Sequence, residues 1–141
     1  IINGKAIAEN ILQYIKKEIE DLAAKSKEIP ILAIVLVGSN PASEIYVRNK
    51  ILAAEKVGIK TKLLRFDSNI SNTNLIAEIS KLNNFESISG IIVQLPLPSH
   101  INKEDIIGAI DPDKDVDGFH PLNVGKLYSG LGEGLIPCTA R

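Results

Sequence analysis

Residues 31–41 read Ile-Leu-Ala-Ile-Val-Leu-Val-Gly-Ser-Asn-Pro, and this stretch decides the fold. Its first seven residues are all apolar, which is typical of a β-strand that is covered on both faces. Asn40 is a favoured helix N-cap, and Pro41 is a favoured first helical residue. The stretch therefore predicts a buried strand that leads directly into a helix over 41–57, which should stop at Gly58.

Helical and extended patterns alternate along the rest of the chain. The predicted elements are, in order, a helix over 5–26, a strand over 60–66, a helix capped by Ser71 or Asn72, a strand over 90–95 and a short helix from Asn102 to about Ile110. From Asp111 onward Pro, Gly and Asp predict loop, with one short strand near Leu135 and Ile136. Strands separated by helices form βαβ units, so residues 1–141 should fold as one α/β domain of three layers (α/β/α) with a small, mainly parallel sheet.

Composition fits a globular domain and excludes several classes. The 141 residues are 45% hydrophobic and 23% charged, with a net charge of -1, so neither nucleic acid nor an anionic membrane is an expected partner. No apolar run approaches the roughly 20 residues of a membrane span. The single cysteine, Cys138, excludes an internal disulfide and fits a reducing, cytoplasmic location. The first residue is Ile1 rather than Met, so we do not expect the chain to begin at a native start.

The predicted helix over 41–57 carries three candidate site residues on one face. Ser43, Tyr46 and Lys50 fall within a narrow arc at about 100° per residue. Tyr46 offers a flat ring for stacking, and Lys50 offers a proton donor whose pKa falls readily on burial. Spacing alone favours the simpler interpretation, in which Tyr46 packs and Lys50 meets water, because functional lysines are the minority.

Gln94 lies inside an otherwise apolar strand and must find hydrogen-bond partners there. In open parallel sheets, ligands bind beyond the carboxyl ends of the strands. A ligand or a catalytic side chain could satisfy this amide, and so could a neighbouring backbone group. The sequence leaves both possibilities open.

An Asp-rich turn occupies 111–118. Its spacing matches the opening of a calcium-binding EF-hand loop, but Val124 stands where the closing Glu is needed, so calcium is rejected. Either the turn has only a structural role, or it presents a carboxylate to a ligand that has paired N–H donors. His100, His120 and Cys138 are too scattered for a predicted metal site, so no metal is expected.

Three segments together resemble the signatures of the methylenetetrahydrofolate dehydrogenase/cyclohydrolase family. They are Val-Gly-Ser-Asn-Pro-Ala-Ser-x-x-Tyr-Val-x-x-Lys at 37–50, Gly-Ile-Ile-Val-Gln-Leu-Pro-Leu-Pro at 90–98, and Lys-Asp-Val-Asp-Gly-Phe-His-Pro-Leu-Asn-x-Gly at 114–125. The segments at 1–5 and 137–139 are also similar to the family, so the resemblance covers the whole chain in order. Ala140 departs from it, because the family usually has Pro there.

The resemblance implies a role for each matching residue. Lys50 would be the general acid/base, Gln94 would hydrogen-bond and tune it, and Tyr46 would stack on the folate. Asp117 would hold the pterin edge, while Ser43 and Pro121 would shape the pocket. Tyr46, Lys50, Gln94 and the Asp-rich turn are also the positions that spacing and composition single out without the resemblance.

The resemblance also implies the reactions and the partners. Hydride would pass from 5,10-methylenetetrahydrofolate to NADP, and water would then open the methenyl product to 10-formyltetrahydrofolate. The family's NADP-binding Rossmann domain should follow residue 141, so we expect this chain alone to lack dehydrogenase activity and leave its cyclohydrolase activity open. A cytoplasmic homodimer in one-carbon metabolism, paired mainly through that further domain, is the expected state of the whole protein.

The sequence also allows two other interpretations. The chain could be the substrate domain of a different two-domain dehydrogenase, which would not need Tyr46, Lys50 and Gln94 in these contexts. It could also be a non-catalytic α/β binding module. In that case Lys50 should titrate normally and no small ligand should bind.

Overall fold

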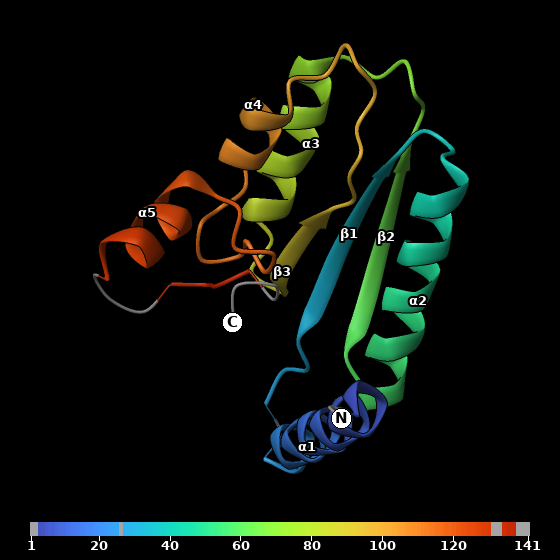
Figure 1. Cartoon of the computed structure of the whole chain (residues 1–141), viewed down its shortest axis with the longest axis vertical. Helices are drawn as coiled ribbons and strands as arrows, with labels where there is room; N and C mark the ends of the chain where they lie inside the picture. Colours follow the sequence, from blue (N-terminus) through green and yellow to red (C-terminus); the bar gives the residue numbers. More distant parts are fainter. Residues whose placement is uncertain (1–2, 26, 131–133, 138–141) are drawn as a thin grey trace.

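A parallel sheet of three strands forms the centre of the computed structural model, which describes residues 3–25, 27–130 and 134–137. The strands are β1 (Ile31–Val37), β2 (Lys60–Phe66) and β3 (Ile88–Val93), in the order β2-β1-β3. Figure 1 shows helices on both sides of this sheet. The predicted three-layer α/β domain is confirmed, and β1 and β2 have the predicted bounds.

Both faces of the central strand are covered, which explains its uninterrupted apolar run. Successive side chains of a strand point to opposite faces. On one face, Val35 and the strand residues two positions before and after it pack with Leu75 and Ile106 of the covering helices. Ile34 and Leu36 pack with Val47 on the other face, which is covered by α2 (Pro41–Val57).

The predicted caps set the helix bounds. The Asn40 side chain accepts hydrogen bonds at the start of α2, and Gly58 ends that helix in the left-handed region at φ 86°. Ser71 caps α3 (Asn72–Asn83), and Asn102 caps α4 (Lys103–Gly108). α1 (Gly4–Ala24) packs against α2 rather than on the sheet (Figure 1).

The prediction of loop from Asp111 onward was wrong for the segment that forms α5 (Pro121–Ser129). His120 caps this helix, since its Nδ1 accepts from Leu122 N at 3.1 Å, and Pro121 supplies a preset first residue. Histidine is not among the strongly preferred N-cap residues, so the start of the helix was missed. The predicted strand at Leu135 and Ile136 was also wrong, because neither residue is in a strand.

The third strand is displaced from its prediction. It covers Ile88–Val93 rather than 90–95, so Gln94 follows the strand instead of lying within it. Gln94 N still donates to Val35 O at 2.9 Å, which holds the residue against the end of the sheet. In the described part of the chain, no helix has the length and apolar character needed to cross a membrane.

Candidate active site

A lysine and an amide meet at the carboxyl edge of the sheet. Lys50, on α2, donates from Nζ to Gln94 Oε1 at 2.9 Å across 44 residues of sequence. Gln94 is only 9% exposed, and its Nε2 donates to Leu95 O at 2.7 Å. The amide nitrogen is already bonded to a carbonyl, so the amide oxygen is turned toward the lysine. A charged lysine has donors and no acceptor, which matches this oxygen.

This arrangement settles the partner of Gln94 that the sequence left open. The amide bonds both a neighbouring backbone carbonyl and the Lys50 side chain. Lys50 itself is half-buried, so the simpler interpretation of a fully solvated lysine does not hold. A lysine held by one fixed acceptor presents its remaining protons in defined directions.

Asp117 lies beside this pair and has a perturbed titration. Burial raises the pKa of the Asp117 carboxyl above its usual value; Lys50 acts to lower it, and Asp115 acts to raise it. Among the described residues, Asp117 has no hydrogen-bond partner for its carboxylate. A partly buried carboxyl without an internal partner is suited to accept N–H donors from a ligand.

The remaining predicted site residues lie around this centre in different ways. The Tyr46 side chain is 62% exposed on α2, so the interpretation in which it packs is wrong and the ring is open to a ligand. Ser43 is only 2% exposed, and its Oγ has no hydrogen-bond partner among the described groups. Pro121 is exposed at the start of α5, where it lines a hollow of about 370 Å³ with Leu95 and Phe119.

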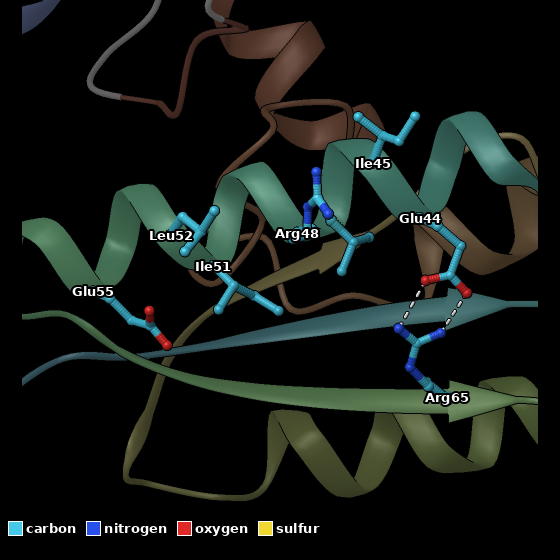
Figure 2. A pocket seen from close by; sticks show the side chains of 8 residues that line it. Glu44, Ile45, Arg48, Ile51, Leu52, Glu55 and Arg65 are labelled. Carbon is cyan, nitrogen blue, oxygen red and sulfur yellow. Dashed lines mark hydrogen bonds and ion pairs between the residues drawn. The ribbon is translucent and has the colours of Figure 1, made fainter.

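A separate hollow of about 370 Å³ is lined by residues of α2 and by Arg65 of β2 (Figure 2). Ile45, Arg48 and Leu52 line it, and Glu44 pairs there with Arg65 of β2. At about 100° per residue these helix positions lie on the side away from Lys50. None of the predicted site residues lines this hollow.

Two buried polar residues near the site were not singled out from the sequence. Asp115 is 1% exposed and Asn123 is 2% exposed, and they bond each other through Asp115 Oδ2 and Asn123 Nδ2 at 3.0 Å. Asp115 stands in the same Asp-rich turn as the exposed Asp113, and composition does not distinguish the two. Within the described ranges, no cluster of three or more His, Cys, Asp or Glu side chains could hold a metal ion.

The fold and the site define a class of protein. An open parallel sheet with a lysine, an amide and a carboxyl gathered at its carboxyl edge is typical of a catalytic α/β domain that acts on a small molecule. Sequence comparison gives the family: residues 2–117 match the catalytic domain of tetrahydrofolate dehydrogenase/cyclohydrolase, and the chain belongs to this family.

Individual relatives agree with this assignment. The chain is 58% identical over 140 residues to the bifunctional protein FolD of Rickettsia bellii, covering 99% of this chain and 50% of the relative. It is 52% identical to FolD of a Sulfurihydrogenibium species, covering 99% of this chain and 49% of that protein. The chain thus spans about half the length of the curated relatives it matches.

Solved structures share the fold. The FolD dehydrogenase/cyclohydrolase of Campylobacter jejuni superposes with a TM-score of 0.94 at 46% identity, over 97% of this chain and 48% of that chain. FolD of Trypanosoma brucei, complexed with NADP and an inhibitor, has a TM-score of 0.93 at 34% identity, over 99% of this chain and 48% of that chain. Family membership makes the first rival interpretation, a different dehydrogenase, wrong.

The described residues do not form the kind of site that would hold NADP through its phosphates. Dinucleotide phosphates typically bind where a turn with several glycines joins a strand to a helix. The turns that follow β1 and β2, at 38–40 and 67–71, contain one glycine between them.

The raised pKa of Asp117 predicts how stability depends on pH. The folded state binds this proton more tightly than the unfolded state, so the contribution of Asp117 to stability is fully present below its unfolded pKa. That contribution is lost as pH rises through the higher folded pKa. Asp117→Asn should therefore gain stability over wild type as pH rises from acid, where it gains nothing, through the unfolded pKa of aspartate (about 4) toward neutral pH.

Urea unfolding of both proteins across this pH range measures the difference directly. Asp113→Asn, at an exposed position of the same turn, is the matched control and should differ from wild type by a constant amount. A pH-independent difference between Asp117→Asn and wild type would contradict the prediction.

Proposed function

We propose that this chain is the folate-binding, catalytic half of a bifunctional methylenetetrahydrofolate dehydrogenase/cyclohydrolase. The hydrogen bond between Lys50 and Gln94 at the carboxyl edge of the sheet carries the proposal. It supplies a positioned proton-transfer group where α/β folds bind their ligands. The Asp117 carboxyl, on which Lys50 acts, could accept donors from a pterin edge, and the exposed ring of Tyr46, about one helical turn before Lys50, could stack on an aromatic ligand.

The hydrolytic reaction requires three proton transfers. Water adds to the methenyl carbon of 5,10-methenyltetrahydrofolate, and the Lys50 amine accepts the proton that the water loses. The bond from this carbon to N5 then breaks, N5 gains a proton from Lys50, and the hydroxyl loses its proton as the formyl C=O forms. One proton is released overall, and the product is 10-formyltetrahydrofolate. Gln94 keeps Lys50 pointing at this centre by accepting one of its N–H groups.

Binding has its own set of residues in this proposal. The ring of Tyr46 stacks on the folate, and the Asp117 carboxyl accepts N–H donors from the pterin edge. Ser43 and Pro121 shape the pocket, and the unpartnered Ser43 hydroxyl supports such a role. For the whole protein, the proposal includes NADP as the hydride acceptor, a homodimeric state and a cytoplasmic location.

Binding of 5-formyltetrahydrofolate, a stable folate, tests the proposal without requiring turnover. We expect Tyr46→Ala to weaken binding by at least about fivefold, since stacking on an aromatic ring contributes roughly 1 kcal/mol beyond the buried area. Titration calorimetry on the wild type and the variant measures this change.

Tyr14→Ala is the matched control, because Tyr14 is 66% exposed on α1 and Tyr46 is 62% exposed on α2. The control should bind as tightly as wild type. Equal affinity of Tyr46→Ala and Tyr14→Ala would remove the stacking role. Absence of binding by wild type would favour the remaining rival, a non-catalytic module.

A further inference from the structure

Asp115 is a buried carboxylate that joins two parts of the chain. Its Oδ2 accepts from His120 N at 2.8 Å and from Asn123 Nδ2 at 3.0 Å. Asn123 Nδ2 also donates to Pro112 O at 2.9 Å, which ties α5 back to the start of the Asp-rich turn. Asp115 therefore holds the turn and the N-terminus of α5 in one arrangement.

The residues next to Asp115 are fixed as well. Lys114 Nζ donates to Asn83 O at 2.6 Å and to Phe85 O at 2.9 Å, and Ile91 N donates to Lys114 O at 2.7 Å. Asp115 itself forms a parallel bridge with Ile91. The turn is thus attached both to the end of α3 and to strand β3.

Close packing fixes the backbone on both sides of Asp117. A Cβ on Gly90 of β3 would come within 2.5 Å of Val116 Cγ1, so only glycine leaves room for that side chain. Gly118 has φ +70°, and a Cβ there would come within 2.7 Å of Leu135 O and 2.8 Å of Pro137 N. Asp117 lies between these two contacts, with Lys50 and Asp115 as the charged groups that act on it.

We propose that Asp115 is a positioning residue, whose buried hydrogen bonds hold the Asp117 carboxyl in place for the ligand. Burying a carboxylate is costly, and an apolar side chain of similar volume would fill the same space more cheaply. A carboxylate that accepts two directed hydrogen bonds instead fixes one geometry for the turn. The identity of the ligand at Asp117 rests on the proposed function, but the positioning of Asp117 does not.

The test compares Asp115→Ala, which removes the acceptor, with Asp115→Asn, which keeps one oxygen acceptor. Affinity for 5-formyltetrahydrofolate should fall about ten- to a hundredfold in Asp115→Ala. This is the contribution of one hydrogen bond to a charged group, here the bond between the ligand and the displaced Asp117 carboxyl. Asp115→Asn should retain most of the affinity. Asp113→Ala, which removes an exposed carboxylate from the same turn, is the matched control and should bind as wild type does.

A double-mutant cycle separates positioning from a general loss of stability. In the Asp117→Asn background, Asp115→Ala should cost little further affinity, because the carboxyl that it positions is already gone. An equal loss in both backgrounds, or no loss in a folded Asp115→Ala variant, would overturn the proposal. If Asp115→Ala does not fold, Asn123→Ala takes its place in the cycle, since it removes one of the two donors to Asp115.

NMR on the ligand-free protein distinguishes this proposal from the proposed function. Asp115→Ala should increase the fast motion of the Asp117 amide, and it should lower the pKa of the Asp117 carboxyl toward its ordinary value as burial and the charge of Asp115 are lost. If Asp115→Ala shows these changes while the wild-type protein binds no folate, positioning is supported and the proposed function is overturned. An unchanged Asp117 in Asp115→Ala would overturn positioning whatever the protein binds.

Discussion

Replacing Lys50 with methionine is expected to lower the rate of methenyltetrahydrofolate hydrolysis by about 10²–10⁴-fold, the usual contribution of a positioned proton-transfer group. Methionine keeps most of the aliphatic stem but has no proton to move. Gln94 Oε1 would also lose its donor, because Lys50 Nζ is the group bonded to it at 2.9 Å. The decay of the methenyl absorbance, measured against buffer, gives the rate for each protein.

Lys56→Met is the matched control, since Lys56 is an exposed lysine near the end of the same helix. It should hydrolyse the substrate at the wild-type rate. Because the role proposed for Lys50 is in catalysis rather than in binding, Lys50→Met should still bind 5-formyltetrahydrofolate. A variant that hydrolyses as fast as wild type would eliminate Lys50 as the general acid/base. Wild type that binds folate but does not exceed buffer would mean that catalysis needs groups outside this chain.

Gly118→Ala is expected to lower the free energy of unfolding by about 2–5 kcal/mol. Two costs add: roughly 1–2 kcal/mol for a side chain in the left-handed region, and about 1–3 kcal/mol for overpacking. The second cost applies because the new Cβ would meet backbone atoms, Leu135 O at 2.7 Å and Pro137 N at 2.8 Å, which cannot rotate away. This loss is a large fraction of the roughly 5–15 kcal/mol of a typical domain.

Gly125→Ala makes the same chemical change within α5 and should have the opposite sign. A Cβ at this position meets nothing within 4 Å, and alanine favours a helix over glycine by roughly 0.5–1 kcal/mol. Urea denaturation of the two variants beside wild type measures both effects. Equal stability of Gly118→Ala and wild type would show that the segment at 135–137 does not press on the turn in solution.

The sequence by itself determined the elements whose ends are set locally. α2 and β2 have their predicted bounds because Asn40, Gly58 and the neighbouring apolar runs act within a few residues. Tyr46 and Lys50, the carriers of the proposed chemistry, were also named from the sequence. Their spacing places them on one helix face, and the family resemblance implied their roles. α5 escaped prediction because its cap is a histidine within a stretch rich in turn residues.

Only the tertiary structure decided which of these residues meet. The parallel order β2-β1-β3 brings the carboxyl ends of the strands to one edge, and this places Gln94 within 2.9 Å of a lysine 44 residues away. The same packing gave two similar residues of one turn different surroundings: Asp115 is buried among donors, whereas Asp117 is left without an internal partner among the described residues. Local sequence does not encode such differences, because burial and partners depend on the segments that pack against the turn from elsewhere in the chain.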